Sequence, residues 1–175
     1  MRSDFVVSFE DGSAMAVEVK TVVDTDFAPH TAPVLTAAER KKRCVYVGNG
    51  VPYQRAAIFP WGTQKQLLDP NDKSSPKVVS TRAIKHVREL TLIASGQRTD
   101  EAYPQLSAAV LFIVVRDDAK QFRPNHEACP QFAAHLSAAK EAGVVIAACQ
   151  VAFELDSRAM CNVRYMGTVP IDWRF

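Results

Sequence analysis

The sequence lacks the cysteine and histidine patterns that hold zinc. Its four cysteines, Cys44, Cys129, Cys149 and Cys161, include no C-x-x-C pair, and its four histidines form no H-E-x-x-H motif. A zinc enzyme is therefore not expected. Scattered cysteines of this kind are typical of buried, reduced thiols inside the cell.

Long apolar runs and a strong charge of either sign are also missing. The longest apolar run, residues 108–115, is as long as a strand and far shorter than a membrane span. No apolar stretch follows the first residues to predict a signal peptide. We therefore expect an intracellular, cytoplasmic protein without membrane contact. The formal net charge of +2 neither favours nor excludes a nucleic-acid partner.

The sequence does contain a regular order of strand and helix patterns within 175 residues, the length of a single domain. The order is two strands, an irregular segment, a helix, an apolar strand, a helix and two further strands. Their predicted ranges are 5–9, 14–23, 82–95, 108–116, 130–143, 144–155 and 158–169. Helices that connect apolar strands predict an α/β (mixed α+β) fold with a mixed central sheet flanked by helices.

The irregular segment covers residues 24–79 and is interrupted by six prolines. We predict that it is an inserted elaboration of the single domain 1–175. The elements predicted inside it are a basic helix at 36–43, strands at 44–47 and 55–59, and a surface loop at 65–75. The run Arg40–Arg43 either contacts phosphates or forms a solvated helix face, and the sequence leaves both interpretations open.

The first two strands predict a hairpin whose register brings charged side chains together. Residues 10–12, Glu-Asp-Gly, suit a three-residue loop closed by a left-handed glycine. The numbers of opposite residues then sum to 22, so Asp4 lies across from Glu18. Side chains alternate along a strand, so Lys20 shares their face. The residues of the other face are predicted to be core: Phe5, Val7, Phe9, Met15, Val17 and Val19.

Asp4, Glu18 and Lys20 are the predicted catalytic residues, and Asp4 and Glu18 are the predicted metal ligands. Carboxylates that face each other across a strand pair lie roughly 5 Å apart and repel unless a cation compensates them. Mg²⁺ or Mn²⁺ suits carboxylate, carbonyl and water oxygens, and the Val19 carbonyl is a further candidate ligand. Lys20 is placed to orient or deprotonate the attacking water and to stabilise developing charge. Alternatively, Glu18 and Lys20 are solvated partners on an exposed sheet face.

The sequence also resembles a known family through several motifs in one order. Residues 3–5 (SDF) followed by 17–22 (VEVKTV) resemble the D-F … VEVKSV signature of the sugar fermentation stimulation protein A family. Later segments of the family resemble residues 57–60, 80–90, 112–114, 122–124 and 138–146. The resemblance implies a restriction-endonuclease-like domain with a PD-(D/E)xK site, DNA binding and a link to sugar utilisation. The family's preceding OB-like domain is expected to be absent, because the chain begins three residues before Asp4.

The resemblance also assigns roles to individual residues. The three predicted catalytic residues fall on the nuclease triad positions. Arg82, Lys85 and His86 fall on a helix motif near that site and are predicted to bind nucleic acid. A plain surface pair between Lys85 and Glu89 is the alternative. Trp61 stands where the family has Asp, which removes one acidic candidate ligand.

Two functions from different classes follow from these observations, and a structural or protein-interaction domain is a third alternative, against which the opposed Asp4 and Glu18 argue. The first is a hydrolase, a Mg²⁺- or Mn²⁺-dependent nuclease of the sugar fermentation stimulation family that cleaves phosphodiesters. The second is a non-catalytic DNA-binding or regulatory module that retains the nuclease fold. DNA is the expected nucleic-acid partner in both, and the oligomeric state is left open.

Overall fold

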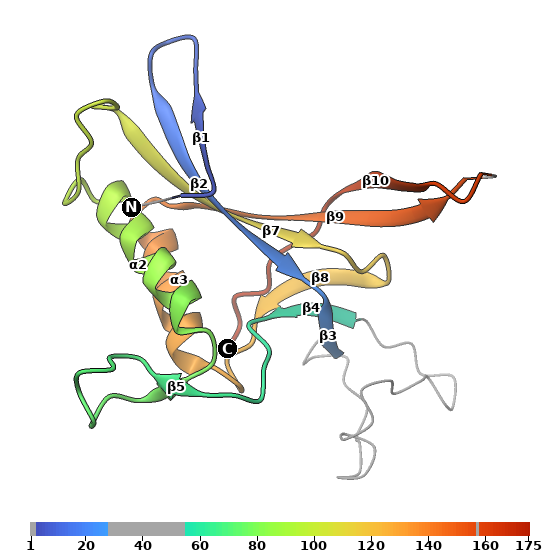
Figure 1. Cartoon of the computed structure of the whole chain (residues 1–175), viewed down its shortest axis with the longest axis horizontal. Helices are drawn as coiled ribbons and strands as arrows, with labels where there is room; N and C mark the ends of the chain where they lie inside the picture. The colour runs from blue at the N-terminus through green and yellow to red at the C-terminus, as the bar shows by residue number, and fades with distance from the viewer. Residues whose placement is uncertain (1–2, 28–54, 157) are drawn as a thin grey trace.

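A five-stranded sheet with strand order β1–β2–β7–β9–β10 lies at the centre of the computed structural model, which describes residues 3–27, 55–156 and 158–175 (Figure 1). Its strands are β1 (Phe5–Ser8), β2 (Ala14–Val22), β7 (Leu106–Val114), β9 (Val145–Leu155) and β10 (Cys161–Thr168). β2, β7 and β9 are parallel, while β1 and β10 pair antiparallel at the two edges. The predicted mixed fold is thereby confirmed.

A three-stranded sheet packs beside the first one and extends its core. Its strands, in spatial order, are β3 (Asp24–Phe27), β4 (Arg55–Phe59) and β8 (Ala119–Pro124). Phe112 of β7 stacks on Phe122 of β8 with ring centroids 4.2 Å apart, which joins the two sheets. The prediction of a strand at 55–59 is confirmed. The strand β8 was missed because only Ala119 and Phe122 are apolar in its sequence, AKQFRP.

A short hairpin formed by β5 (Gln66–Leu67) and β6 (Lys77–Val78) leads into the first described helix. The prediction of a plain surface loop at 65–75 is therefore wrong at its beginning, because Gln66 and Leu67 pair with β6. Such two-residue strands carry too few alternating side chains to be recognised from sequence.

Two helices, α2 (Thr81–Ala94) and α3 (Pro130–Glu141), contact each other and lie on one side of the five-stranded sheet (Figure 1). Both predicted helices are thereby confirmed within one or two residues. Ser80 occupies the residue before α2 with a φ of 59°, and its side chain makes no capping hydrogen bond. The start of the helix was thus predicted to within one residue.

The structure reverses the predicted assignment of the core face of the first hairpin. Phe5, predicted to be core, is 61% exposed, whereas Ala16 and Glu18 are 3% and 1% exposed. Phe9 and Val7 are also exposed. The reason is that the helices pack against the side of the sheet that carries the even-numbered residues. Apolar alternation predicted two faces correctly, but it does not indicate which one the helices cover.

We name the two sides of the sheet by these residues. The covered face consists of the even-numbered residues of β2, β7 and β9, which face the helices and the second sheet. The open face consists of the odd-numbered residues of β1, β2, β7, β9 and β10, the last up to Tyr165, where a bulge interrupts the register.

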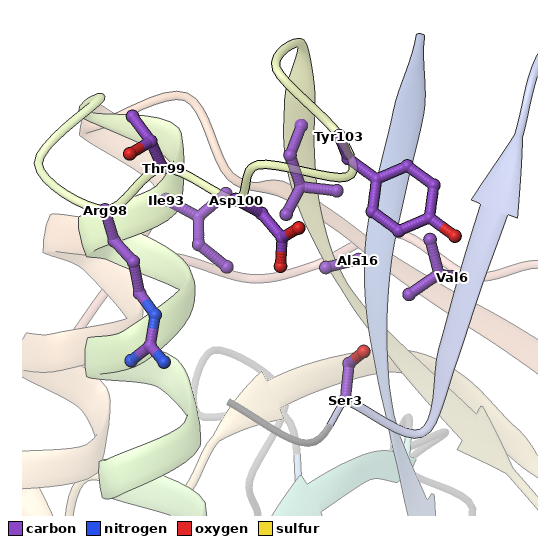
Figure 2. Close-up of a pocket in the computed structure, with 9 residues that line it drawn as sticks. Ser3, Val6, Ala16, Ile93, Arg98, Thr99, Asp100 and Tyr103 are labelled. Carbon is purple, nitrogen blue, oxygen red and sulfur yellow. The ribbon is translucent and has the colours of Figure 1, made fainter. Parts of the chain in front are cut away.

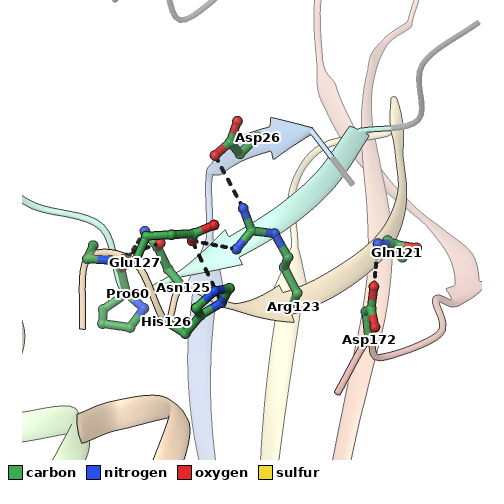
Figure 3. A network of polar contacts seen from close by, with 9 residues as sticks. Asp26, Pro60, Gln121, Arg123, Asn125, His126, Glu127 and Asp172 are labelled. Atoms are coloured by element: carbon green, nitrogen blue, oxygen red, sulfur yellow. Dashed lines mark hydrogen bonds and ion pairs between the residues drawn. The ribbon is translucent and has the colours of Figure 1, made fainter. Parts of the chain in front are cut away.

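A buried arginine connects the small sheet to the loop before α3 (Figure 3). Arg123 of β8, 3% exposed, donates to Asp26 of β3 at 3.2 Å and to Glu127 at 2.8 Å. Burial raises the pKa of Glu127, but the hydrogen bond and charge of Arg123 outweigh it and leave that pKa below its usual value. Asn125 donates to the carbonyl of Pro60 at 3.1 Å nearby. The two carboxylates compensate the charge of a buried guanidinium, whose Nε has no hydrogen-bond partner among the described residues.

Other predictions concern residues outside the described part of the chain. The basic helix at 36–43, including Arg40–Arg43, and the strand at 44–47 belong to that group. None of the described helices has the length and apolar character needed to cross a bilayer.

Candidate metal and nucleic-acid site

The loop between β1 and β2 fixes the register on which the candidate site depends. The amide of Phe9 donates to Ser13 O at 2.9 Å, and the amide of Gly12 donates to Phe9 O at 3.1 Å. Gly12 has a φ of 83°, which a side chain would strain. Phe5 consequently pairs with Val17, as the three-residue loop predicted.

Asp4 lies directly before β1, at the position that continues this register towards Glu18. Its Oδ2 accepts a hydrogen bond from the amide of Val19 at 2.9 Å. The carboxylate is therefore held against the backbone of β2, although the Asp4 side chain is exposed to solvent. Asp4 and Glu18 line one cavity, so their two carboxylates lie at the same site.

Glu18 is a charged residue inside the hydrophobic core region, 1% exposed. Its Oε1 contacts the ammonium of Lys20 and Nδ1 of His86. Its Oε2 is buried and has no hydrogen-bond partner. A buried carboxylate oxygen without a partner costs free energy, so its retention points to a ligand that is missing from this set of contacts. This rules out the interpretation of Glu18 and Lys20 as solvated surface partners.

Helix α2 completes the cavity. Ser80, Arg82 and Ala83 line it together with Asp4, Glu18, Val19 and Lys20, and its volume is about 260 Å³. His86, one turn further along, brings its ring to Glu18 from the helix side. Nε of Arg82 lies 3.5 Å from Nε2 of His86, so the two side chains are neighbours on the exposed side of the helix.

A larger groove of about 1540 Å³ continues from the cavity along α2 towards the β5–β6 hairpin. Asp4 and Arg82 line both hollows, so they are connected. The groove is lined by more basic than acidic side chains: Arg82, Lys85, Arg88 and Arg98 against Asp4 and Glu89. Because Arg98 pairs with Glu89, three cations and Asp4 remain along its length. A groove of this charge attracts anions.

A second, smaller cavity adjoins this groove near the C-terminal end of α2 (Figure 2). It has a volume of about 60 Å³ and shares Ser3 and Arg98 with the groove. Val6, Tyr103 and Leu106 contribute to its walls. A space of this size accommodates a few waters, and we assign it no ligand.

The structure thus brings most of the predicted site residues together and separates one of them. Lys85 lines the groove but not the cavity, whereas His86 contacts Glu18 instead of projecting only towards a ligand. Sequence reasoning missed Arg88 and Arg98. The spacing of three between Lys85 and Arg88 places them on one helix side and was a usable signal. Arg98 follows the helix, and no local pattern indicates its position.

The donor set suits a hard divalent cation better than zinc. Asp4 and Glu18 offer carboxylate oxygens, one of them the unpartnered Oε2 of Glu18. Among the described residues, no three His, Cys, Asp or Glu side chains are grouped to hold a metal ion. Two carboxylates suffice for Mg²⁺, which keeps several of its waters, but they do not form a zinc site.

The comparisons with known proteins find similarity to one family. The family model "Sugar fermentation stimulation protein RE domain" matches residues 73–157, which include α2, β7, β8 and α3. The match covers 85 of the 175 residues, so the chain is similar to this family over just under half of its length. This matched segment contains Arg82, Lys85 and His86 and begins after Asp4, Glu18 and Lys20.

Relatives with known sequences give the same result over part of their length. Sugar fermentation stimulation protein homologues are 41% identical over 81 residues in Desulforamulus reducens and 44% identical over 72 residues in Alkaliphilus metalliredigens. These alignments cover 46% and 41% of this chain, and 30% and 27% of the homologues. The chain therefore matches less than a third of the length of these two relatives.

A solved structure shows the same fold. SfsA of Pyrococcus furiosus, solved in complex with Ca²⁺, superposes on 98% of this chain and 50% of its own chain with a TM-score of 0.58. The sequences are 20% identical over that superposition. The expected family fold is confirmed by this likeness.

Proposed function

We propose that this protein belongs to the sugar fermentation stimulation family, binds nucleic acid and cleaves its phosphodiester bonds at a Mg²⁺- or Mn²⁺-dependent site. The observation that carries the proposal is the buried Glu18, whose Oε2 lacks a partner while its Oε1 contacts Lys20 and His86. This group lies at the end of a basic groove that an anionic strand can occupy.

Each residue has a defined task in this proposal. Asp4 and Glu18 would hold the divalent ion, which supplies a Lewis acid for hydrolysis when bound. The ammonium of Lys20 lies beside Glu18 and would stabilise the negative charge that develops on the attacked phosphate. The ring of His86 positions Glu18 from the helix side. The Ca²⁺ bound to SfsA of Pyrococcus furiosus supports a hard cation as the ligand.

Arg82 and Lys85 would bind the phosphates that flank the cleaved bond. Both side chains are exposed on α2 and line the groove, and Arg82 also lines the cavity. Contacts to backbone phosphates position a strand without reading its sequence. DNA is the expected substrate, and binding should weaken steeply as salt is raised.

Cleavage of DNA and RNA substrates in Mn²⁺ tests the catalytic part. Lys20→Ala should lower the rate by about 100-fold or more, as loss of a charge-stabilising group does at other sites. Lys73→Ala is the matched control, because Lys73 is exposed and lines neither the cavity nor the groove. Equal rates for wild type and Lys20→Ala would exclude this site as the source of cleavage.

Metal binding is tested without any activity measurement. An ion that binds only the folded protein stabilises it by about 2.7 kcal/mol at 100 times its dissociation constant. Mn²⁺ should therefore raise the melting temperature of the wild type, and Glu18→Gln should abolish that rise. A melting temperature of the wild type that does not respond to Mn²⁺ counts against the metal site.

A non-catalytic nucleic-acid-binding module is the second candidate function. The contact of the Lys20 ammonium with Glu18 Oε1 favours it, because this cation already compensates part of the carboxylate charge. This function predicts salt-dependent binding of DNA that Mn²⁺ does not change, without turnover. Arg82→Ala should then weaken binding, whereas Glu18→Gln should not.

A further inference from the structure

The open face of the five-stranded sheet is uncharged and largely apolar, apart from the exposed polar residues Thr21 and Ser107. None of its odd-numbered residues is Asp, Glu, Lys, Arg or His, from Phe5 of β1 to Tyr165 of β10. Large side chains on it are unusually accessible, including Phe153 at 56% and Val163 at 61% exposed. No helix or strand within 3–27, 55–156 or 158–175 covers this side (Figure 1).

The area of this face is close to what a stable dimer needs. The five strands contain 41 residues together, and at a strand spacing of about 4.8 Å and about 3.3 Å per residue they cover about 650 Å². A standard protein–protein interface buries about 800 Å² on each partner. A typical monomer exposes apolar patches of only about 300–600 Å² at most, so a patch of this size marks an interaction site.

We propose that the open face is the interface of a symmetric homodimer, in which two copies of this chain pack sheet against sheet. A charge-free surface is complementary to a second copy of itself, since no like charges meet in any two-fold orientation. Phe153 pairs across strands with Val163, which places the two side chains side by side at one end of the interface. Sheets that pack in this way lie about 10 Å apart with their side chains interdigitated.

The dimer leaves the candidate site accessible. Glu18 and Lys20 belong to the covered face, on the opposite side of the sheet from the proposed interface. The groove along α2 lies on that same side. Dimerisation would therefore produce a particle with two outward-facing grooves, and the proposed interface is independent of the proposed function.

Sedimentation velocity of the full chain between about 1 and 100 µM tests the proposal, since interfaces of this area span micromolar to tighter affinities. The wild type should shift from monomer to dimer mass with concentration. Phe153→Lys should weaken association at least about tenfold, because it would bury an unpaired ammonium in the interface. Met160→Lys is the control, since Met160 is 62% exposed in the β9–β10 turn and off the open face. A wild type that is monomeric throughout, or a Phe153→Lys protein that associates like wild type, would overturn the proposal.

A second measurement on the wild type locates the interface even if Phe153→Lys fails to fold. Cys149 is partly exposed on the open face of β9. Its alkylation by N-ethylmaleimide, followed by peptide mass spectrometry, should slow several-fold as the protein concentration rises through the dimerisation range. An alkylation rate that stays constant while dimers form would place the interface elsewhere and contradict the proposal.

Discussion

Within β2, β7 and β9, the two faces of the five-stranded sheet carry similar numbers of apolar side chains but have different surroundings. On the covered face, Phe112 is fully buried beneath helices and the second sheet. On the open face, its neighbour in the chain, Ile113, remains partly accessible, and Phe153 is 56% exposed. The charged residue Glu18 lies on the covered face, whereas the open face has no charged residue at all.

A sheet with one buried face usually has apolar residues on that face and polar residues on the face exposed to solvent. Here the charged residue Glu18 lies on the buried face, and the exposed face has no charge. A carboxylate on a buried face destabilises the fold unless it is compensated, and an apolar face in water favours association. The covered face therefore combines core packing with the candidate site, and the open face is specialised for a partner. In this sheet, therefore, the polarity of a strand residue does not indicate whether that residue is buried.

The largest effect expected in this comparison comes from adjacent residues of β7. Phe112→Ala removes a fully buried ring that stacks on Phe122, and it should lower the free energy of unfolding by about 3–5 kcal/mol. Ile113→Ala truncates a partly exposed side chain and should cost about 1 kcal/mol in dilute protein. Urea denaturation of both variants measures the difference. Equal costs at low concentration would mean that the open face is covered within one chain.

A smaller effect is expected from the next pair, Glu18 and Val17 of β2. Glu18→Gln leaves the Lys20 ammonium without its carboxylate on a mostly buried face, and should cost about 1–2 kcal/mol. Val17→Thr changes an open-face residue and should cost no more than about 0.5 kcal/mol. Chemical denaturation at one pH and low protein concentration compares them. A Glu18→Gln protein more stable than wild type would show that the unpartnered oxygen outweighs the contact with Lys20.

Much of the fold was predictable from sequence because local patterns determine it. The Glu-Asp-Gly loop fixed the register that brings Asp4 towards Glu18, and the stripe of Ile84, Val87 and Leu90 located α2. The covering of the sheet was not predictable, since both faces of β2 and β7 are apolar and only the placement of the helices distinguishes them.

The candidate site was likewise predicted in part. The alternation of side chains along a strand places Glu18 and Lys20 on one face of β2. The contact between His86 and Glu18, in contrast, joins segments 68 residues apart and depends on tertiary packing. Arg98 reaches the groove after the end of α2 for the same reason. Long-range placement of this kind has no local sequence pattern.

The smallest predicted effect concerns the helices that cover one face of the sheet. Burial lowers the pKa of His135 on α3, and the charge of Arg88 on α2 lowers it further. The unfolded chain, with an ordinary histidine pKa near 6.5, therefore binds more protons than the folded protein at mildly acidic pH. This contribution to stability is present above about pH 6.5 and is lost as the pH falls through the lower pKa of the folded state.

His135→Gln removes that titration. Relative to this variant, the wild type should lose stability between pH 7.5 and pH 5.5, by less than the costs predicted above for Phe112→Ala and Glu18→Gln. Arg88→Gln should reduce the pH dependence without abolishing it, because burial of His135 remains. Urea midpoints at several pH values measure both. The open face carries no Asp, Glu, His, Lys or Arg, so a pH dependence that survives in His135→Gln must come from groups outside that face.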